Sequence, residues 1–358
     1  MEEHWPYVLT MRALLLAAFL SGAMGCSLAV DEVDAVGDVG GERRQHESAA
    51  RAELSVQRMV TPEGEVRSDV SARFVSVSGD LDHADAQRII GVGPSLRHHL
   101  ARMAGTRALG CTFHAASGAD SLALQGVPPG AAPLGAGNIE LLDVGDISLR
   151  MEGQGADGRG AQQVVPLAAR AFPDVGEVVS GVVYTTRGVD APLPDATTYW
   201  LEADAALGAG EGLALRVAAP RALSSIDVTQ ATLVQLGLGR QRFADDLLIV
   251  AAGEEMRLNW VAGDSAAGDF VVVSVHGVGA RSNGESRTLE CMFEDDGSAV
   301  IAGEQMSFAA GEDLDLVVHR LRRTRVKLGQ PLQRIGEPVV TDAVVWFDFA
   351  VSARAAVQ

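Results

Sequence analysis

The feature that most constrains this chain is a period of two in its apolar residues. Segments such as EVVSGVVYTT (177–186), DFVVVSVHG (269–277) and VVWFDFAV (344–351) are rich in β-branched and aromatic residues. Turn-forming runs such as PDVG, PDAT and DDGS separate segments of this kind, and 40 of the 358 residues are glycine. Many short strands with turn signals between them are typical of β-sandwiches and barrels. The sequence therefore predicts an all-β protein.

The strand pattern divides the chain into two sandwich-like units, at 70–222 and 223–358. A small helical insert is predicted within the first unit, at 82–104, where HADAQRII and PSLRHHLARM follow a helical period. The segment before the first unit, residues 26–69, is dense in charge and poor in apolar residues. Such a composition favours a disordered tether that carries the folded body.

The first 25 residues have the order of a secretory signal. Arg12 supplies a positive start, residues 13–20 are an unbroken apolar run, and residues 21–25 are small apart from one methionine. The run is too short to span a bilayer as a mature helix. Two acidic residues follow the first methionine, where a signal needs positive charge, which indicates that translation begins at Met11.

The end of this signal, AMGC at 23–26, resembles the lipobox of bacterial lipoproteins, with Ala23 where leucine is usual. The resemblance implies that Cys26 carries a diacylglyceryl thioether, that the signal is cut before it and that the new N-terminus is acylated. Two or more acyl chains hold a protein firmly on a membrane. Ser27 follows the cysteine, and the absence of Asp there favours the outer membrane. The alternative is plain secretion, with Cys26 a bystander.

The charge balance bears on partners. The chain has 47 acidic residues against 29 Lys plus Arg, a formal net charge of −18. That balance argues against nucleic acid and against electrostatic binding to anionic lipid. No second apolar stretch reaches membrane length, so we expect the lipid anchor to be the only membrane contact. An envelope protein or polysaccharide is the expected partner.

Two other cysteines lie in similar contexts. Cys111 is in LGCTF (109–113) and Cys291 in LECMF (289–293), so both have the pattern L-x-C-x-F. A duplicated sandwich unit and chance are both open explanations. If the cysteines occupy equivalent places in two units, they cannot approach closely enough for a bridge. We expect two buried thiols, while a disulfide would mean that both cysteines share one core.

The C-terminal third also resembles a family. DDLLIVAAGEEMRLNWVAGD, LECMFEDDGSAVIAG and VVWFDFA are similar to the C-terminal half of uncharacterised myxobacterial-type lipoproteins, and the likeness extends over most of 138–350. The resemblance implies a lipid-anchored β-sandwich body. It implies no catalytic residues.

The sequence predicts no catalytic, metal or cofactor site. The G-x-G-x-x-G match at 153–158 is followed by a loop and a strand rather than by the helix that a dinucleotide site requires, so we expect a hairpin loop. No two histidines have the helical i,i+4 spacing of a zinc site. Acidic turns such as EDD (294–296) match no calcium-loop pattern and are expected to be solvated.

Two features remain as candidate binding residues. Trp200 is predicted to share a strand face with Thr198 and Glu202, so its ring is a candidate binding platform or, alternatively, a half-buried side chain under a loop. A basic strip in this acidic chain is a candidate seat for an anionic envelope component, or else a solvated strand paired with acids; it comprises Arg320, Arg322, Arg323, Arg325 and Lys327.

These observations predict a lipid-anchored envelope or surface protein of binding or structural type, not an enzyme. The alternatives are an envelope hydrolase with an unrecognised site and a subunit of an envelope complex. A hydrolase requires converging His, acid or Ser groups, while a subunit requires an apolar surface patch.

Overall fold

A computed structural model of the whole chain describes most of the body of the protein. The described residues are 50–81, 83–90, 109–116, 137–154, 160–172, 178–186, 196–203, 213–245, 247–263, 268–278, 286–332 and 339–358. The predicted signal, Cys26 and residues 91–104 of the predicted helical insert lie outside them. In the described part of the chain, no helix is long and apolar enough to cross a membrane.

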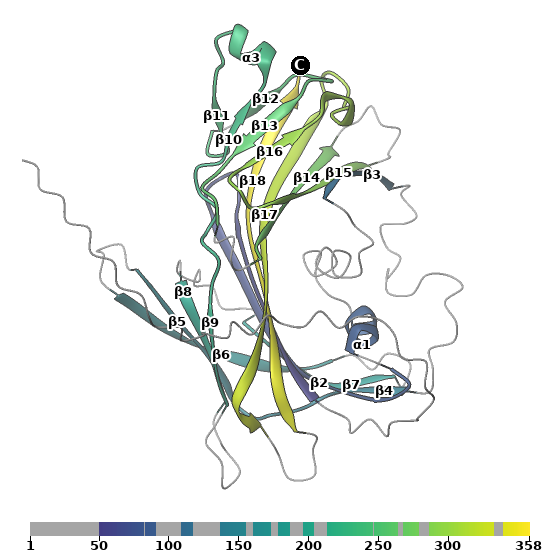
Figure 1. Cartoon of the computed structure of the whole chain (residues 1–358), viewed down its shortest axis with the longest axis vertical. Coiled ribbons are helices and arrows are strands. Elements are labelled where there is room, and N and C mark those ends of the chain that lie inside the picture. Colours follow the sequence, from purple (N-terminus) through teal and green to yellow (C-terminus); the bar gives the residue numbers. More distant parts are fainter. Residues whose placement is uncertain are drawn as a thin grey trace, which may run out of the picture. The chain divides into compact units, whose positions relative to one another are not determined.

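The structure is mostly β, which confirms the predicted class. Its centre is a long antiparallel pair, β17 (Asp313–Leu332) and β18 (Val340–Val357), the yellow strands of Figure 1. Even-numbered residues of β17 and odd-numbered residues of β18 point to one face, because side chains alternate along a strand. That face is apolar over most of its length, and the opposite face carries most of the polar side chains of the pair. We call the first the core face and the second the outward face.

The pair lies inside a mixed 14-stranded sheet in the described residues. On one side, β18 pairs in parallel with β1, and the sheet continues through β2, β4, β7, β6, β5 and β8 to β9. On the other side, β17 pairs with β14, and the sheet ends in β15 and β3, while β12 pairs with the end of β18. The bounds are β1 Ala50–Val60, β2 Val66–Gly79, β3 Gly110–Ala116, β4 Gly137–Leu141, β5 Ile147–Gln154, β6 Gly160–Ala171, β7 Val179–Thr185, β8 Ala196–Ala203, β9 Leu213–Ala218, β12 Leu248–Val250, β14 Phe270–Val278 and β15 Ser286–Glu294.

A smaller antiparallel sheet has four strands in the order β11, β10, β13 and β16. These are short, as the close spacing of turn residues between 220 and 305 predicts. Their bounds are β10 Asp227–Thr229, β11 Gln241–Arg242, β13 Met256–Asn259 and β16 Ser298–Ile301.

The core face of the hairpin serves two hydrophobic cores. In the first, Leu54 and Phe347 pack with residues of β5 and β8, and the rings of Phe347 and Tyr199 have centroids 5.5 Å apart. In the second, Leu316 and Val318 pack with residues of the small sheet. Each buried large apolar side chain contributes about 1.5–3 kcal/mol to stability. The predicted division at residue 222 therefore separates strands that pack on one common hairpin.

Residues 50–69 differ from the predicted tether, because they form β1, the turn after it and the first four residues of β2. Only one face of β1 is apolar: Ala52, Leu54 and Val56 are buried, while Arg51 and Glu53 point outward. A strand of this kind has the low apolar content of a tether, and its period of two is obscured by the small residue Ala52.

Few helices occur among the described residues. The helix α1 (His83–Ile90) confirms the start of the predicted insert and packs Ala86 and Ile90 against Val75 and Val77 of β2. The remaining helices are short: α3 (Ala231–Gln235) and the 3-10 turn η2 (Gly303–Gln305).

Candidate functional site

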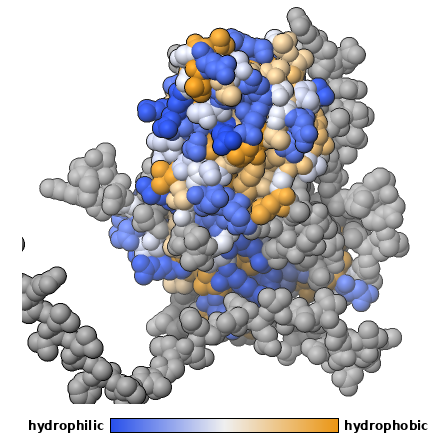
Figure 2. Space-filling view, turned by 45° about the horizontal axis from the view of Figure 1, so that its top comes forward, coloured by the Kyte–Doolittle hydropathy of each residue, from blue (hydrophilic) through white to orange (hydrophobic). Residues whose placement is uncertain are grey.

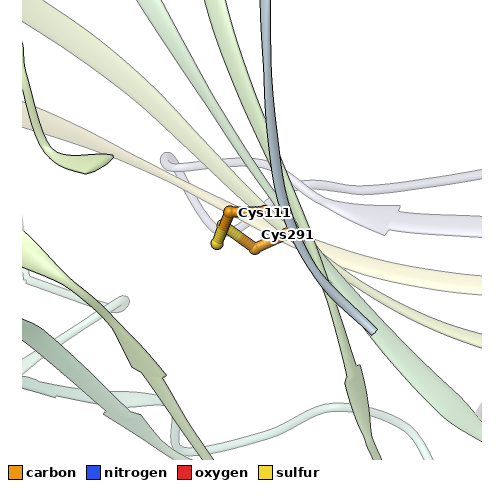
Figure 3. The surroundings of a disulfide bond; sticks show 2 residues. All are labelled: Cys111 and Cys291. Carbon is orange, nitrogen blue, oxygen red and sulfur yellow. A yellow bond between two sulfur atoms is a disulfide. The ribbon is translucent and has the colours of Figure 1, made fainter. Parts of the chain in front are cut away.

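The predicted pair of free thiols is wrong, because Cys111 and Cys291 are bonded with an S–S distance of 2.04 Å (Figure 3). The two cysteines lie opposite one another on the neighbouring antiparallel strands β3 and β15. The two L-x-C-x-F segments therefore pair with each other within one sheet and do not occupy equivalent places in two units. Cys291 is buried in the second core, and Cys111 packs against it from the edge strand.

The pleat of β17 divides the predicted basic strip between its two faces. Arg320 and Arg322 lie on the core face, while Arg323, Arg325 and Lys327 lie on the outward face. The strip is therefore not one surface. Its two halves have different surroundings and different chemistry.

Arg320 is fully buried in an ion pair. Its Nε donates to Oδ2 of Asp295 at 2.7 Å and its Nη2 donates to Oδ1 at 2.9 Å, and Trp260 Nε1 donates to the same Oδ1 at 2.7 Å. The guanidinium also donates to the carbonyl oxygens of Arg221 and Val261, at 2.7 and 2.6 Å. These bonds leave Arg320 no contact with solvent, so it does not meet a ligand at the surface.

Arg322 repeats this arrangement two residues on. Its Nε and Nη2 donate to the two carboxylate oxygens of Asp269 at 2.6 and 2.8 Å, and its Nη1 donates to the carbonyl oxygen of Ala218 at 3.4 Å. Gly263 lies against both aspartates, because an added Cβ would fall 2.2 Å from an Asp295 oxygen and 2.9 Å from an Asp269 oxygen. Arg320 and Arg322 thus hold connecting segments onto the hairpin between the two cores.

On the outward face, four arginines come together on three strands. They form what we call the arginine cluster, which consists of Arg51 on β1, Arg73 on β2, and Arg323 and Arg325 on β17. Two carboxylates lie among them. Glu53 accepts from Arg73 Nε at 2.6 Å and Asp342 accepts from Arg51 Nε at 3.1 Å. Arg325, with 61% of its side chain exposed, also pairs with Asp342, at 3.0 Å.

Arg323 differs from the other members because it has no carboxylate partner in the described part of the chain. Its guanidinium lies over the ring of Trp346, 5.1 Å from the centroid, and its buried Nε has no hydrogen-bond partner. Burial lowers the pKa of Arg323, and the positive charges of Arg51 and Arg325 lower it further, against an opposing effect of Glu53. Among the described residues, Arg323 is therefore the member of the cluster that contacts no carboxylate.

Trp200 lies elsewhere, on β8 between β5 and β9. The register places Thr198, Trp200 and Glu202 on one face, as predicted. The guanidinium carbons of Arg150 and Arg216 lie over the ring, 4.7 and 5.4 Å from its centroid. Trp200 is thus half-buried between two arginines rather than presented as an open ring, and it does not join the arginine cluster.

Nearer the other end of the hairpin, the outward face carries two histidines. His319 Nδ1 lies 2.8 Å from Asp348 Oδ1, and His276 Nδ1 lies 3.0 Å from the Thr288 hydroxyl. Burial lowers the pKa of His276, against opposing effects of Glu290 and Asp315. Burial also acts to lower the pKa of His319, but the Asp348 carboxylate outweighs it and the pKa lies above its ordinary value.

These contacts were not visible from the sequence, because they join strands that are distant along the chain. A period of two separates Arg320 from Arg323, but it does not say which face is buried. Among the residues that the structure describes, no group of three or more His, Cys, Asp or Glu side chains is arranged to hold a metal ion. No protein-family model matches the chain, and no curated protein matches it.

Proposed function

We propose that this protein is a lipid-anchored, extracytoplasmic envelope protein of binding or structural type, with a body of two sandwich-like halves. The disulfide carries the proposal. Disulfides persist in oxidising compartments outside the cytoplasm. Of three cysteines, two are bonded to each other, which leaves Cys26 at the end of the signal as the odd thiol available for acylation.

The sequence supports the anchor and its location. The signal order at 12–25, the lipobox-like AMGC and the similarity to myxobacterial-type lipoproteins all favour attachment through Cys26. Ser27 favours the outer membrane. The acidic charge balance favours solubility and argues against nucleic acid, so an envelope protein or a polysaccharide is the proposed class of partner.

Metabolic labelling with an alkyne analogue of palmitate tests the anchor. The full chain and its Cys26→Ser variant are expressed in a Gram-negative host, and fractions are compared after coupling to a dye. We expect label on the full chain in the outer-membrane fraction and none on the variant. Equal labelling of both chains, or an unlabelled product in the medium, would contradict the proposal.

One observation favours a hydrolase as the second candidate. The outward face brings together a histidine bonded to a hydroxyl and a histidine bonded to a carboxylate, His276–Thr288 and His319–Asp348. A histidine oriented by a carboxylate is a usual general base. Within the described part of the chain, however, His319 bonds to no hydroxyl, so the carboxylate-oriented base lacks a nucleophile. Ester hydrolysis that is lost in His319→Gln would favour this candidate, and its persistence in the variant would remove it.

A third candidate, a subunit of an envelope complex, has limited support from the surface. Figure 2 shows apolar patches among hydrophilic ones. At the end of α3, three aliphatic side chains are exposed, namely Val234 (54%), Leu236 (65%) and Leu238 (45%). Three side chains are few against the roughly 20–30 residues per partner of a stable interface. We therefore prefer the binding proposal, which the outward face of the hairpin supports.

A further inference from the structure

We propose that the arginine cluster on the outward face of β1, β2 and β17 is a binding site for a phosphate group, with Arg323 as its central ligand. The site is independent of the lipid anchor. It uses residues that lie far apart in the sequence and that only the sheet brings together.

The register fixes the layout of the site. Arg73, Glu53, Val344 and Arg325 form one row across β2, β1, β18 and β17. Val344 is small and buried, so the longer side chains on both sides of it rise above it. Arg51 belongs to the neighbouring row on one side of Val344.

Arg323 belongs to the neighbouring row on the other side, beside Trp346. Arginines thus lie in the row of Val344 and in the rows on both sides of it. Planar arginine side chains bind phosphate oxygens in pairs of parallel hydrogen bonds.

The carboxylates of the site are already in use. Glu53 accepts from Arg73 through Oε2 and from Gln87 through Oε1, each at 2.6 Å. Asp342 Oδ2 accepts from both Arg51 and Arg325. Neither carboxylate pairs with Arg323 within hydrogen-bonding distance among the described contacts.

Cationic groups outnumber carboxylates at this face among the described residues. Four arginines of the cluster lie beside two carboxylates, and Lys327 lies in the same row as Asp342, although the net charge of the chain is −18. A phosphate carries about −1.5 to −2 charge near neutral pH, so one such group would reduce this local excess of positive charge.

The state of Arg323 indicates where the anion binds. A partly buried charge without a partner is unfavourable, and the two neighbouring arginines add repulsion. A bound phosphate would supply the missing acceptor for Nε and reverse that repulsion. The ring of Trp346 occupies one face of the guanidinium, so the N–H groups in the plane of the guanidinium are those that would donate to a ligand.

Isothermal titration of purified full-length protein in detergent tests the site, with inorganic phosphate as the probe. Arg323→Gln is compared with Arg216→Gln, a matched control, because Arg216 is exposed and also lies over a tryptophan ring. We expect Arg323→Gln to bind phosphate about tenfold more weakly, the loss expected for one charge-assisted donor, and Arg216→Gln to bind as the unaltered protein does. Arg325→Gln serves as the second variant if Arg323→Gln does not fold.

A second arm distinguishes a free phosphate from a lipid headgroup. Cys26→Ser protein, which lacks the acylated cysteine, is sedimented with vesicles of phosphatidylglycerol and, separately, of phosphatidylcholine. Arg323-dependent binding to phosphatidylglycerol vesicles alone assigns the phosphate to a lipid, and Arg323-dependent titration of inorganic phosphate assigns it to a soluble ligand. The proposal is overturned if neither arm shows binding, or if the Arg323 and Arg216 variants behave alike.

Discussion

Arg320 and Asp295 form a two-point ion pair with 0% and 1% of their side chains exposed, between two hydrophobic cores that share one hairpin. Val318, two residues before Arg320, belongs to the second core, while Val326, six residues after it, packs against the first. The arginines of this pair and of the neighbouring pair Arg322–Asp269 lie on β17, between the part of the strand that packs in the second core and the part that packs in the first. Their carbonyl contacts at Ala218 and Arg221 hold the segment that connects β9 to β10.

Asp295→Asn is expected to destabilise the protein by about 3–5 kcal/mol, because it leaves a buried arginine without its counter-charge. Urea unfolding followed by tryptophan fluorescence measures this change. The double variant Arg320→Met/Asp295→Leu removes both charges and is expected to be more stable than Asp295→Asn. If the single variant loses less than the double variant, the ion pair does not have this role.

The Cys111–Cys291 bridge closes a loop with a sequence separation of 180 residues. Replacing both cysteines by serine is expected to lower the free energy of unfolding by about 2–4 kcal/mol, chiefly because the unfolded chain gains freedom. Unfolding with and without a reductant checks the prediction. Reductant should lower the unfolding midpoint of the Cys26→Ser protein, which keeps the bridge, and leave the midpoint of the Cys111→Ser/Cys291→Ser variant unchanged. Equal shifts of the two midpoints would exclude the bridge.

His319 is expected to make stability depend on pH. Its pKa in the folded protein lies above the ordinary value, so its contribution is fully present below about pH 6.5 and is lost as the pH rises through the folded pKa. We expect His319→Gln to cost more stability near pH 6 than near pH 8. Urea unfolding of the variant and of the unaltered protein at a series of pH values measures this difference in stability.

The nearby His276 provides the opposite case. Burial lowers its pKa in the folded protein, so its effect on folding is absent above about pH 6.5 and unfavourable below it. His276→Gln should therefore gain stability relative to the unaltered protein as the pH falls. Glu290 and Asp315 face this histidine, and a loss of stability at low pH in His276→Gln would show that their charges dominate instead.

Gly181 is expected to tolerate no side chain. It has φ +122°, and an added Cβ would lie 2.0 Å from the carbonyl oxygen of Leu141, its partner on β4. Gly181→Ala should lose about 1–3 kcal/mol from backbone strain alone, and more from the clash. Gly237 has φ +80° but open space around it, so Gly237→Ala should lose less stability. Thermal unfolding of both variants compares the two losses. Similar losses would show that the close approach to Leu141 relaxes.

The class of fold could be predicted because strand periodicity and turn residues are local signals, and α1 was recognisable for the same reason. The predicted tether failed at β1, where charged outward residues such as Arg51 and Glu53 conceal a buried face. The disulfide was missed because β3 and β15 are neighbours only through the strand order, which no local pattern encodes.

The candidate site shows the same limit. Arg323 and Arg325 were identified from the sequence, but Arg51 and Arg73 enter the site only through the pairing of β1 and β2 with the hairpin, and Trp346 only through the pairing of β18 with β17. Arg320 and Arg322 were grouped with Arg325 by their position in the sequence, although the pleat sends them into the interior. A grouping by alternate residues would have separated them.

The parallel contact of β1 with β18 has a consequence for biosynthesis. Arg51 and Asp342 are bonded across 291 positions of sequence. β1, the first strand of the described residues, is made long before β18, which covers this edge. Until β18 is made, that edge offers unpaired amide and carbonyl groups to other strands. A truncated chain that stops before residue 340 would keep this edge open, and we expect such fragments to aggregate.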